Sequence, residues 1–135
     1  MTIMSVQGEN ILESLELVSE AQGDLTEPVY AILFDAHPEL EPLFALDTDG
    51  GVRGSMLQYA LECIMDYIGD RTLVTNFVSS SRYVHHGYGV PEHDFDDFFV
   101  AIKQCCQATL GARWTDAMDA EWQAMLKDLS NMKGI

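Results

Sequence analysis

The chain has 135 residues, 47% of them hydrophobic, which suits a single domain over residues 1–135 with a packed core. Its formal net charge of −15 argues against binding to nucleic acid or to an anionic membrane surface. The sequence contains no apolar run of about 18 residues, the length that a membrane-spanning helix needs. Residues 1–5 also lack the basic and apolar regions of a signal peptide, so we expect a soluble, cytoplasmic protein.

Apolar residues at helical spacing predict two amphipathic helices in the first part of the chain. The first spans residues 9–22 and ends at Gly23. Asp24 or Thr26 can cap the second helix. The chain should then change direction at His37-Pro38, because a residue that precedes proline is disfavoured in the helical region.

Two further helices are predicted beyond this corner. After a flexible loop at residues 47–51, a helix over residues 52–68 carries a broad apolar stripe, with Arg53 one turn before Leu57 on the same face. A helix over residues 72–86 should point Leu73, Phe77 and Val84 inward.

His85 lies in the last turn of that helix, before Gly87, Gly89 and Pro91. A histidine held at such a chain reversal is suited to bind a metal ion, with its ring pointing inward. Alternatively, it can interact as a cation with the negative end of the helix dipole. Taken alone, this segment favours the interaction with the dipole over metal binding.

The remaining sequence predicts two long helices, the first ended by Gly111 and the second capped by Thr115. An acidic segment at residues 92–97 could attract a metal ion or a basic partner, although placing negative charge at a helix N-terminus is the simpler interpretation. The three cysteines form no C-x-x-C pair and are expected to be buried free thiols. No segment shows the clean alternation of a β-strand.

Several of these features, taken together and in order, resemble the globin family over nearly the whole chain. They are His37-Pro38-Glu39-Leu40 with Leu43-Phe44, the spacing of Gly54, Leu57, Ala60 and Leu61, His85 followed by Gly89-Val90, and Trp122. The resemblance is greatest to single-domain bacterial haemoglobins and the globin part of flavohaemoglobins. It implies an all-α globin fold whose helices form a three-over-three sandwich around haem b.

The resemblance also implies a set of haem-binding residues. His85 matches the proximal histidine, the metal ligand that binds haem iron, and its neighbour His86 points roughly 100° away on a helix. Phe44 matches the aromatic residue that packs on the porphyrin. The predicted cofactor-binding residues are Phe44, Arg53, Leu57, Arg82, His85, Val90 and Phe95.

On the distal side, where the gas would bind, the resemblance implies Tyr30, Arg53 and Leu57. The Tyr30 hydroxyl would donate a hydrogen bond to bound O2, and Leu57 would form an apolar wall. Arg53 could support this hydrogen bond, hold an anionic ligand or reach a haem propionate, and we slightly favour the propionate. Without a cofactor, Tyr30 would be a core tyrosine and Arg53 a solvated residue at a helix start.

Outside this set, we assign His37 and His93 to the surface.

The resemblance implies a globin that reversibly binds O2, as well as NO or CO, at a pentacoordinate haem b iron. Alternatives are a gas sensor acting on a partner protein, an NO-detoxifying or peroxidase-type enzyme that needs a separate reductase, and a globin-like regulator without haem. Phe95 stands where flavohaemoglobins carry a tyrosine, and the chain stops before the place of their glutamate, which argues against peroxidase-like chemistry. We expect a monomer or a homodimer.

Overall fold

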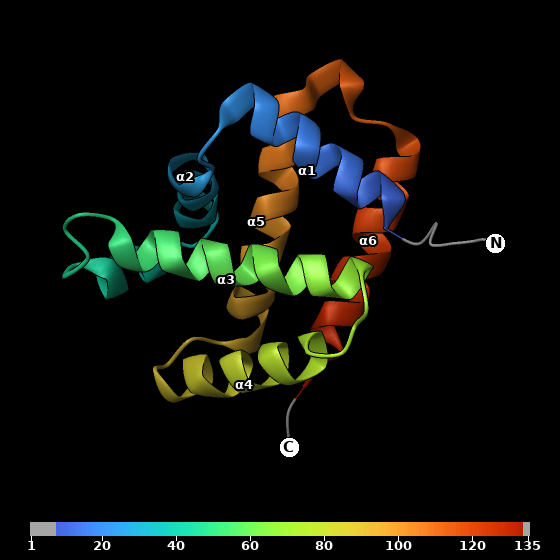
Figure 1. Cartoon of the computed structure of the whole chain (residues 1–135). Helices are drawn as coiled ribbons and strands as arrows, with labels where there is room; N and C mark the ends of the chain where they lie inside the picture. The colour runs from blue at the N-terminus through green and yellow to red at the C-terminus, as the bar shows by residue number, and fades with distance from the viewer. Residues whose placement is uncertain (1–7, 134–135) are drawn as a thin grey trace.

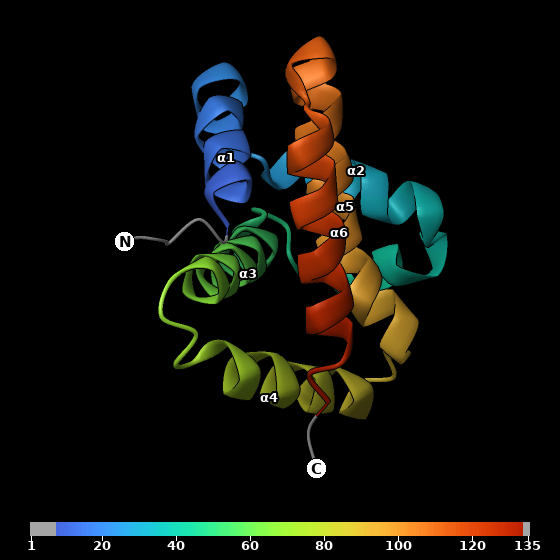
Figure 2. The same cartoon turned by 90° about the vertical axis from the view of Figure 1, so that its right-hand side faces the viewer.

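The computed structural model describes residues 8–133, and this part of the chain is helical and contains no β-strand. The elements are α1 (Glu9–Gln22), α2 (Thr26–Ala36), the 3-10 helix η1 (Pro38–Phe44), α3 (Gly51–Ile68), α4 (Val74–Gly87), α5 (Glu92–Leu110), the 3-10 helix η2 (Gly111–Arg113) and α6 (Asp116–Ser130). Helices α1, α3 and α4 form one layer and α2, α5 and α6 the other (Figures 1 and 2). The predicted all-α fold is confirmed.

Among the described residues, no helix combines the length and the apolar character needed to cross a membrane.

Local signals in the sequence set most of the helix boundaries. Asp24 accepts hydrogen bonds from the backbone N–H and the hydroxyl of Thr26, at 2.9 and 2.7 Å, at the start of α2. The Thr115 hydroxyl oxygen accepts a hydrogen bond from the backbone N–H of Met118 at 3.0 Å and so caps α6, as predicted. Pro38 begins η1 directly after the bend at His37.

The core lies where α1 and α6 pack against α5. The Trp122 indole N–H donates a hydrogen bond to the Ser14 hydroxyl at 2.9 Å, and both side chains are fully buried. Cys63, Cys105 and Cys106 are free and buried, which confirms the prediction from their spacing.

The inward face of α4 differs from the predicted one. Leu73 and Val84 are each 50% exposed, whereas Val74 and Val78 are buried. The difference arises at the start of the helix, because the Asp66 carboxylate accepts hydrogen bonds from the backbone N–H groups of Leu73 and Val74. The helix therefore begins at Val74, and the inward positions continue from there at helical spacing towards His85.

Arg82 ties α4 to the two helices beside it. Its guanidinium donates to the backbone carbonyls of Leu129 at 2.8 Å and Met132 at 3.2 Å, at the C-terminal end of α6. It also forms an ion pair with Asp96 of α5 at 2.8 Å. Only 5% of Arg82 is exposed, so these contacts compensate a buried charge.

We expect Arg82→Met to lower the free energy of unfolding by about 3 kcal/mol, because it leaves the partners of a buried charge without their donor. The matched substitution Arg113→Met, at an exposed arginine, should change it by no more than about 0.5 kcal/mol. Urea denaturation of both variants followed by circular dichroism measures the difference. Equal stabilities would contradict this role of Arg82.

Candidate functional site

A cavity of about 650 Å³ opens between α2, η1, α3, α4 and the first half of α5. Its size lies within the range of small-molecule and cofactor sites, about 300–1,000 Å³. Most of the lining side chains are aliphatic or aromatic. Five of the predicted site residues contribute to the lining, namely Tyr30, Phe44, His85, Val90 and Phe95.

His85 lines this cavity, and a hydrogen bond within α4 orients its ring. Its Nδ1 lies 2.7 Å from the backbone carbonyl oxygen of Ser81, one turn earlier in α4. Because a carbonyl can only accept, Nδ1 carries a proton and donates it, so Nε2 is the ring nitrogen that can offer a lone pair to a ligand. His86, the neighbouring candidate, is exposed and does not line the cavity.

The surroundings of His85 hold its ring in place. The Phe95 ring packs against the imidazole with ring centroids 5.3 Å apart. The backbone N–H groups of Tyr88 and Val90 both donate to the His85 carbonyl at 3.0 Å, and the chain reverses through Gly89 at a positive φ of 85°. The end of α4 thus positions His85 and Val90 on the same cavity wall.

Tyr30 of α2 places a hydroxyl group in the cavity wall. The side chain is buried, and its ring packs against those of Phe34, Phe44 and Phe98 at centroid distances of 5.4–5.6 Å. Within residues 8–133 the hydroxyl has no hydrogen-bond partner. Burial raises the pKa of Tyr30 far above its ordinary value, so the group stays a neutral O–H donor.

An unpaired buried donor is costly and therefore uncommon in folded proteins, about 1–3 kcal/mol per group. A polar ligand in the cavity would provide the missing acceptor.

The Arg53 side chain binds the loop before α3 and does not line the cavity. Its Nε donates to the Asp47 carboxylate at 2.9 Å and its Nη2 to the Asp47 carbonyl at 3.1 Å. Asp47, which does line the cavity, also accepts from the backbone N–H groups of Val52 and Arg53. The loop predicted to be flexible is therefore held in place at its junction with α3.

These donors also determine the charge of Asp47. Burial by itself raises the pKa of the carboxyl, but the donors outweigh this effect and hold it below its ordinary value.

Leu57 also lies away from the cavity. It is buried, and together with Leu61 it faces Leu15 and Leu25, in a separate hollow beside α1 and α2. The predicted single stripe on α3 consists of two separate faces, and the one that lines the cavity carries Val52, Ser55, Met56, Tyr59, Ala60 and Cys63. Met56 stands where the prediction placed Leu57. The spacing of Val52, Met56, Tyr59 and Cys63 was the signal for this second face.

Cys63 adds no competing ligand to the cavity. Burial raises the pKa of its thiol to about 11, so the neutral form predominates at neutral pH. Because only the thiolate binds metal ions well, the sulfur is poorly suited to replace a histidine nitrogen.

Arg82, another predicted site residue, does not line the cavity either. Its guanidinium is held by Asp96 and by the carbonyls at the end of α6. It reaches the site only indirectly, because it lies over the Phe95 ring with its Cζ 4.8 Å from the ring centroid.

The surface assignment is wrong for His37. Its side chain is 15% exposed, and its Nε2 lies 2.7 Å from Asp97 of α5. His93 is a surface residue as predicted, with a side chain that is 75% exposed.

The cavity thus combines an oriented imidazole and an unpaired hydroxyl with an apolar lining, and these groups fit a flat, largely apolar metal cofactor.

Residues 27–132 match the family model for globins, and this range covers most of the chain and all the residues that line the cavity. No curated protein and no solved structure matches the chain significantly. The closer likeness to bacterial haemoglobins stays a prediction. Globins generally bind haem and small gas molecules. From the family match, supported by the all-helical two-layer fold, we conclude that this chain belongs to the globin family.

Proposed function

We propose that this globin binds haem b in the cavity and reversibly binds O2, NO or CO there. The observation that carries the proposal is that one apolar cavity presents both a free imidazole nitrogen on His85 and an unpaired, buried hydroxyl on Tyr30. When bound, haem b would supply a ferrous iron to which a diatomic gas can add. Phe44, Val90 and Phe95 would provide apolar contacts to the macrocycle.

His85 is suited to be the iron ligand because its hydrogen bond to Ser81 fixes both the tautomer and the orientation of the ring. The acceptor is a backbone carbonyl, and the adjacent Phe95 ring offers no hydrogen-bonding group. The imidazole therefore gains less electron density than one bonded to a carboxylate. This favours reversible gas binding over peroxidase-like chemistry.

Tyr30 is suited to stabilise a bound gas without occupying the iron itself. A preorganised O–H donor in an apolar cavity stabilises partial negative charge on a ligand more strongly than water does. Because burial keeps the phenol protonated, it is a poor iron ligand, which supports a pentacoordinate haem.

Removal of NO by catalysis would in addition require electrons from a separate reductase.

Substitution of the two adjacent histidines tests the proposed iron ligand. Wild-type protein and His86→Ala should both develop a Soret band when titrated with hemin, whereas His85→Ala should bind hemin much more weakly. Addition of free imidazole should partly restore the His85→Ala spectrum, because the small molecule can occupy the vacated position. Equal losses in the two variants, or no Soret band in the wild type, would contradict the proposal.

Tyr30→Phe should speed the release of O2 from the ferrous protein by about 10- to 100-fold, the equivalent of a hydrogen bond to a charged acceptor worth about 1.5–3 kcal/mol. Tyr59→Phe is the matched control, because Tyr59 also lines the cavity but is 42% exposed. Stopped-flow mixing with excess CO measures both off-rates. An unchanged rate in Tyr30→Phe, or the same change in both variants, would remove Tyr30 from this role.

A further inference from the structure

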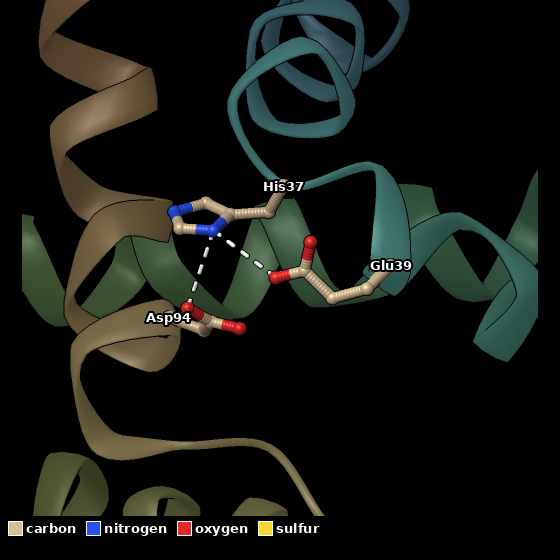
Figure 3. Close-up of side chains that lie close together, drawn as sticks. All are labelled: His37, Glu39 and Asp94. Atoms are coloured by element: carbon tan, nitrogen blue, oxygen red, sulfur yellow. Dashed lines mark hydrogen bonds and ion pairs between the residues drawn. The ribbon is translucent and has the colours of Figure 1, made fainter.

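An imidazole and two carboxylates converge at the corner between α2 and η1, beside the cavity (Figure 3). His37 comes from the bend before η1, Glu39 from η1 and Asp94 from the first turn of α5. His37 Nδ1 lies 3.2 Å from both Glu39 Oε2 and Asp94 Oδ1. One potential ligand atom from each of the three residues lies within 4.8 Å of the others. These three residues form what we call the corner cluster.

Asp94 contributes a buried charge to the corner cluster that lacks full compensation. Its side chain is 1% exposed, and within residues 8–133 its Oδ1 takes part in no well-aligned hydrogen bond. Nitrogens of His93 and His37 approach this oxygen to 2.9 and 3.2 Å as ion-pair contacts only. Because a buried carboxylate is costly unless it is paired or coordinates a metal, a cation in the corner cluster would stabilise the fold.

His37 is oriented as histidine ligands of metal ions usually are. Its Nε2 lies 2.7 Å from the Asp97 carboxylate, which can only accept, so Nε2 carries a proton. The other ring nitrogen, Nδ1, faces the oxygens of Glu39 and Asp94, as Figure 3 shows. In the neutral ring with a proton on Nε2, Nδ1 carries the lone pair. In metal sites, a ligand histidine commonly donates the N–H of its second ring nitrogen to a carboxylate, which orients the ring.

A proton is the alternative cation at this position. The hydrogen bond to Asp97 raises the pKa of His37, and a doubly protonated ring would pair with the same carboxylates. A proton on Nδ1 could be donated to Glu39 Oε2 at 3.2 Å, but it would leave the contact with the buried Asp94 oxygen poorly aligned.

We propose that His37, Glu39 and Asp94 form a binding site for one divalent transition-metal ion, with Zn²⁺ as the best match. One imidazole nitrogen with carboxylate oxygens suits Zn²⁺, whereas Ca²⁺ and Mg²⁺ prefer oxygen ligands alone. His93, whose Nε2 lies 2.9 Å from Asp94, can supply a fourth ligand. The net charge of −15 raises the local concentration of cations around the protein.

Titration of the EDTA-treated, dialysed full chain with zinc chloride, followed by calorimetry, tests this site without any need for haem. We expect one saturable high-affinity site per chain. Glu39→Gln should weaken it by at least about tenfold, because loss of an outer-shell partner alone costs about 10- to 100-fold in affinity. Glu41→Gln, which changes an exposed carboxylate of the same η1, and His85→Ala should both leave the affinity unchanged.

Asp97→Asn provides a second test that keeps all three ligands in place. It should weaken zinc binding by about 10- to 100-fold through the loss of ring orientation, while circular dichroism shows a folded chain. The proposal is overturned if wild-type protein shows no saturable zinc binding, or if Glu39→Gln and Glu41→Gln bind zinc equally well. It is also overturned if calcium chloride binds as tightly as zinc chloride, since this would indicate screening of the acidic surface rather than a site.

Discussion

The site depends on the hydrogen bond between Nδ1 of His85 and the backbone carbonyl of Ser81. This bond fixes the orientation of the ring and selects the tautomer with the proton on Nδ1. It joins two residues that lie one turn apart in α4, so the helical geometry of residues 81–85 brings the ring and the carbonyl together.

The two arginines near the cavity are both held by carboxylates and backbone carbonyls. Arg53 binds Asp47 at the start of α3, and Arg82 binds Asp96 and the end of α6. These contacts hold the helices that surround the cavity, and neither arginine lines it. The Tyr30 hydroxyl remains as a polar group with an unmet need for an acceptor.

The sequence predicted the parts of the structure that depend on local signals. The bend at His37-Pro38, the cap at Thr115 and the helical end at His85 were all foreseen from neighbouring residues. The resemblance to globins added Tyr30 and Phe44, both of which line the cavity.

The predictions that differ from the structure involve contacts between distant residues or a helix with two apolar faces. The acceptors of Arg82 lie 47 and 50 positions away, and the Asp97 partner of His37 lies 60 positions away. No periodicity within one helix can indicate such pairs. On α3, apolar residues occupy both the face towards α1 and the face towards the cavity, so hydrophobicity alone could not separate Leu57 from Met56. The phase of α4 was misjudged because a capping contact, rather than the position of Leu73, sets its start.

The central claim is that the free nitrogen of His85 holds haem iron and leaves a gas-binding position open. Resonance Raman spectroscopy of the hemin-reconstituted, dithionite-reduced protein tests it most directly. We expect the iron–histidine stretching band of a five-coordinate ferrous haem. A six-coordinate ferrous spectrum without this band, or the same band in His85→Ala, would contradict it.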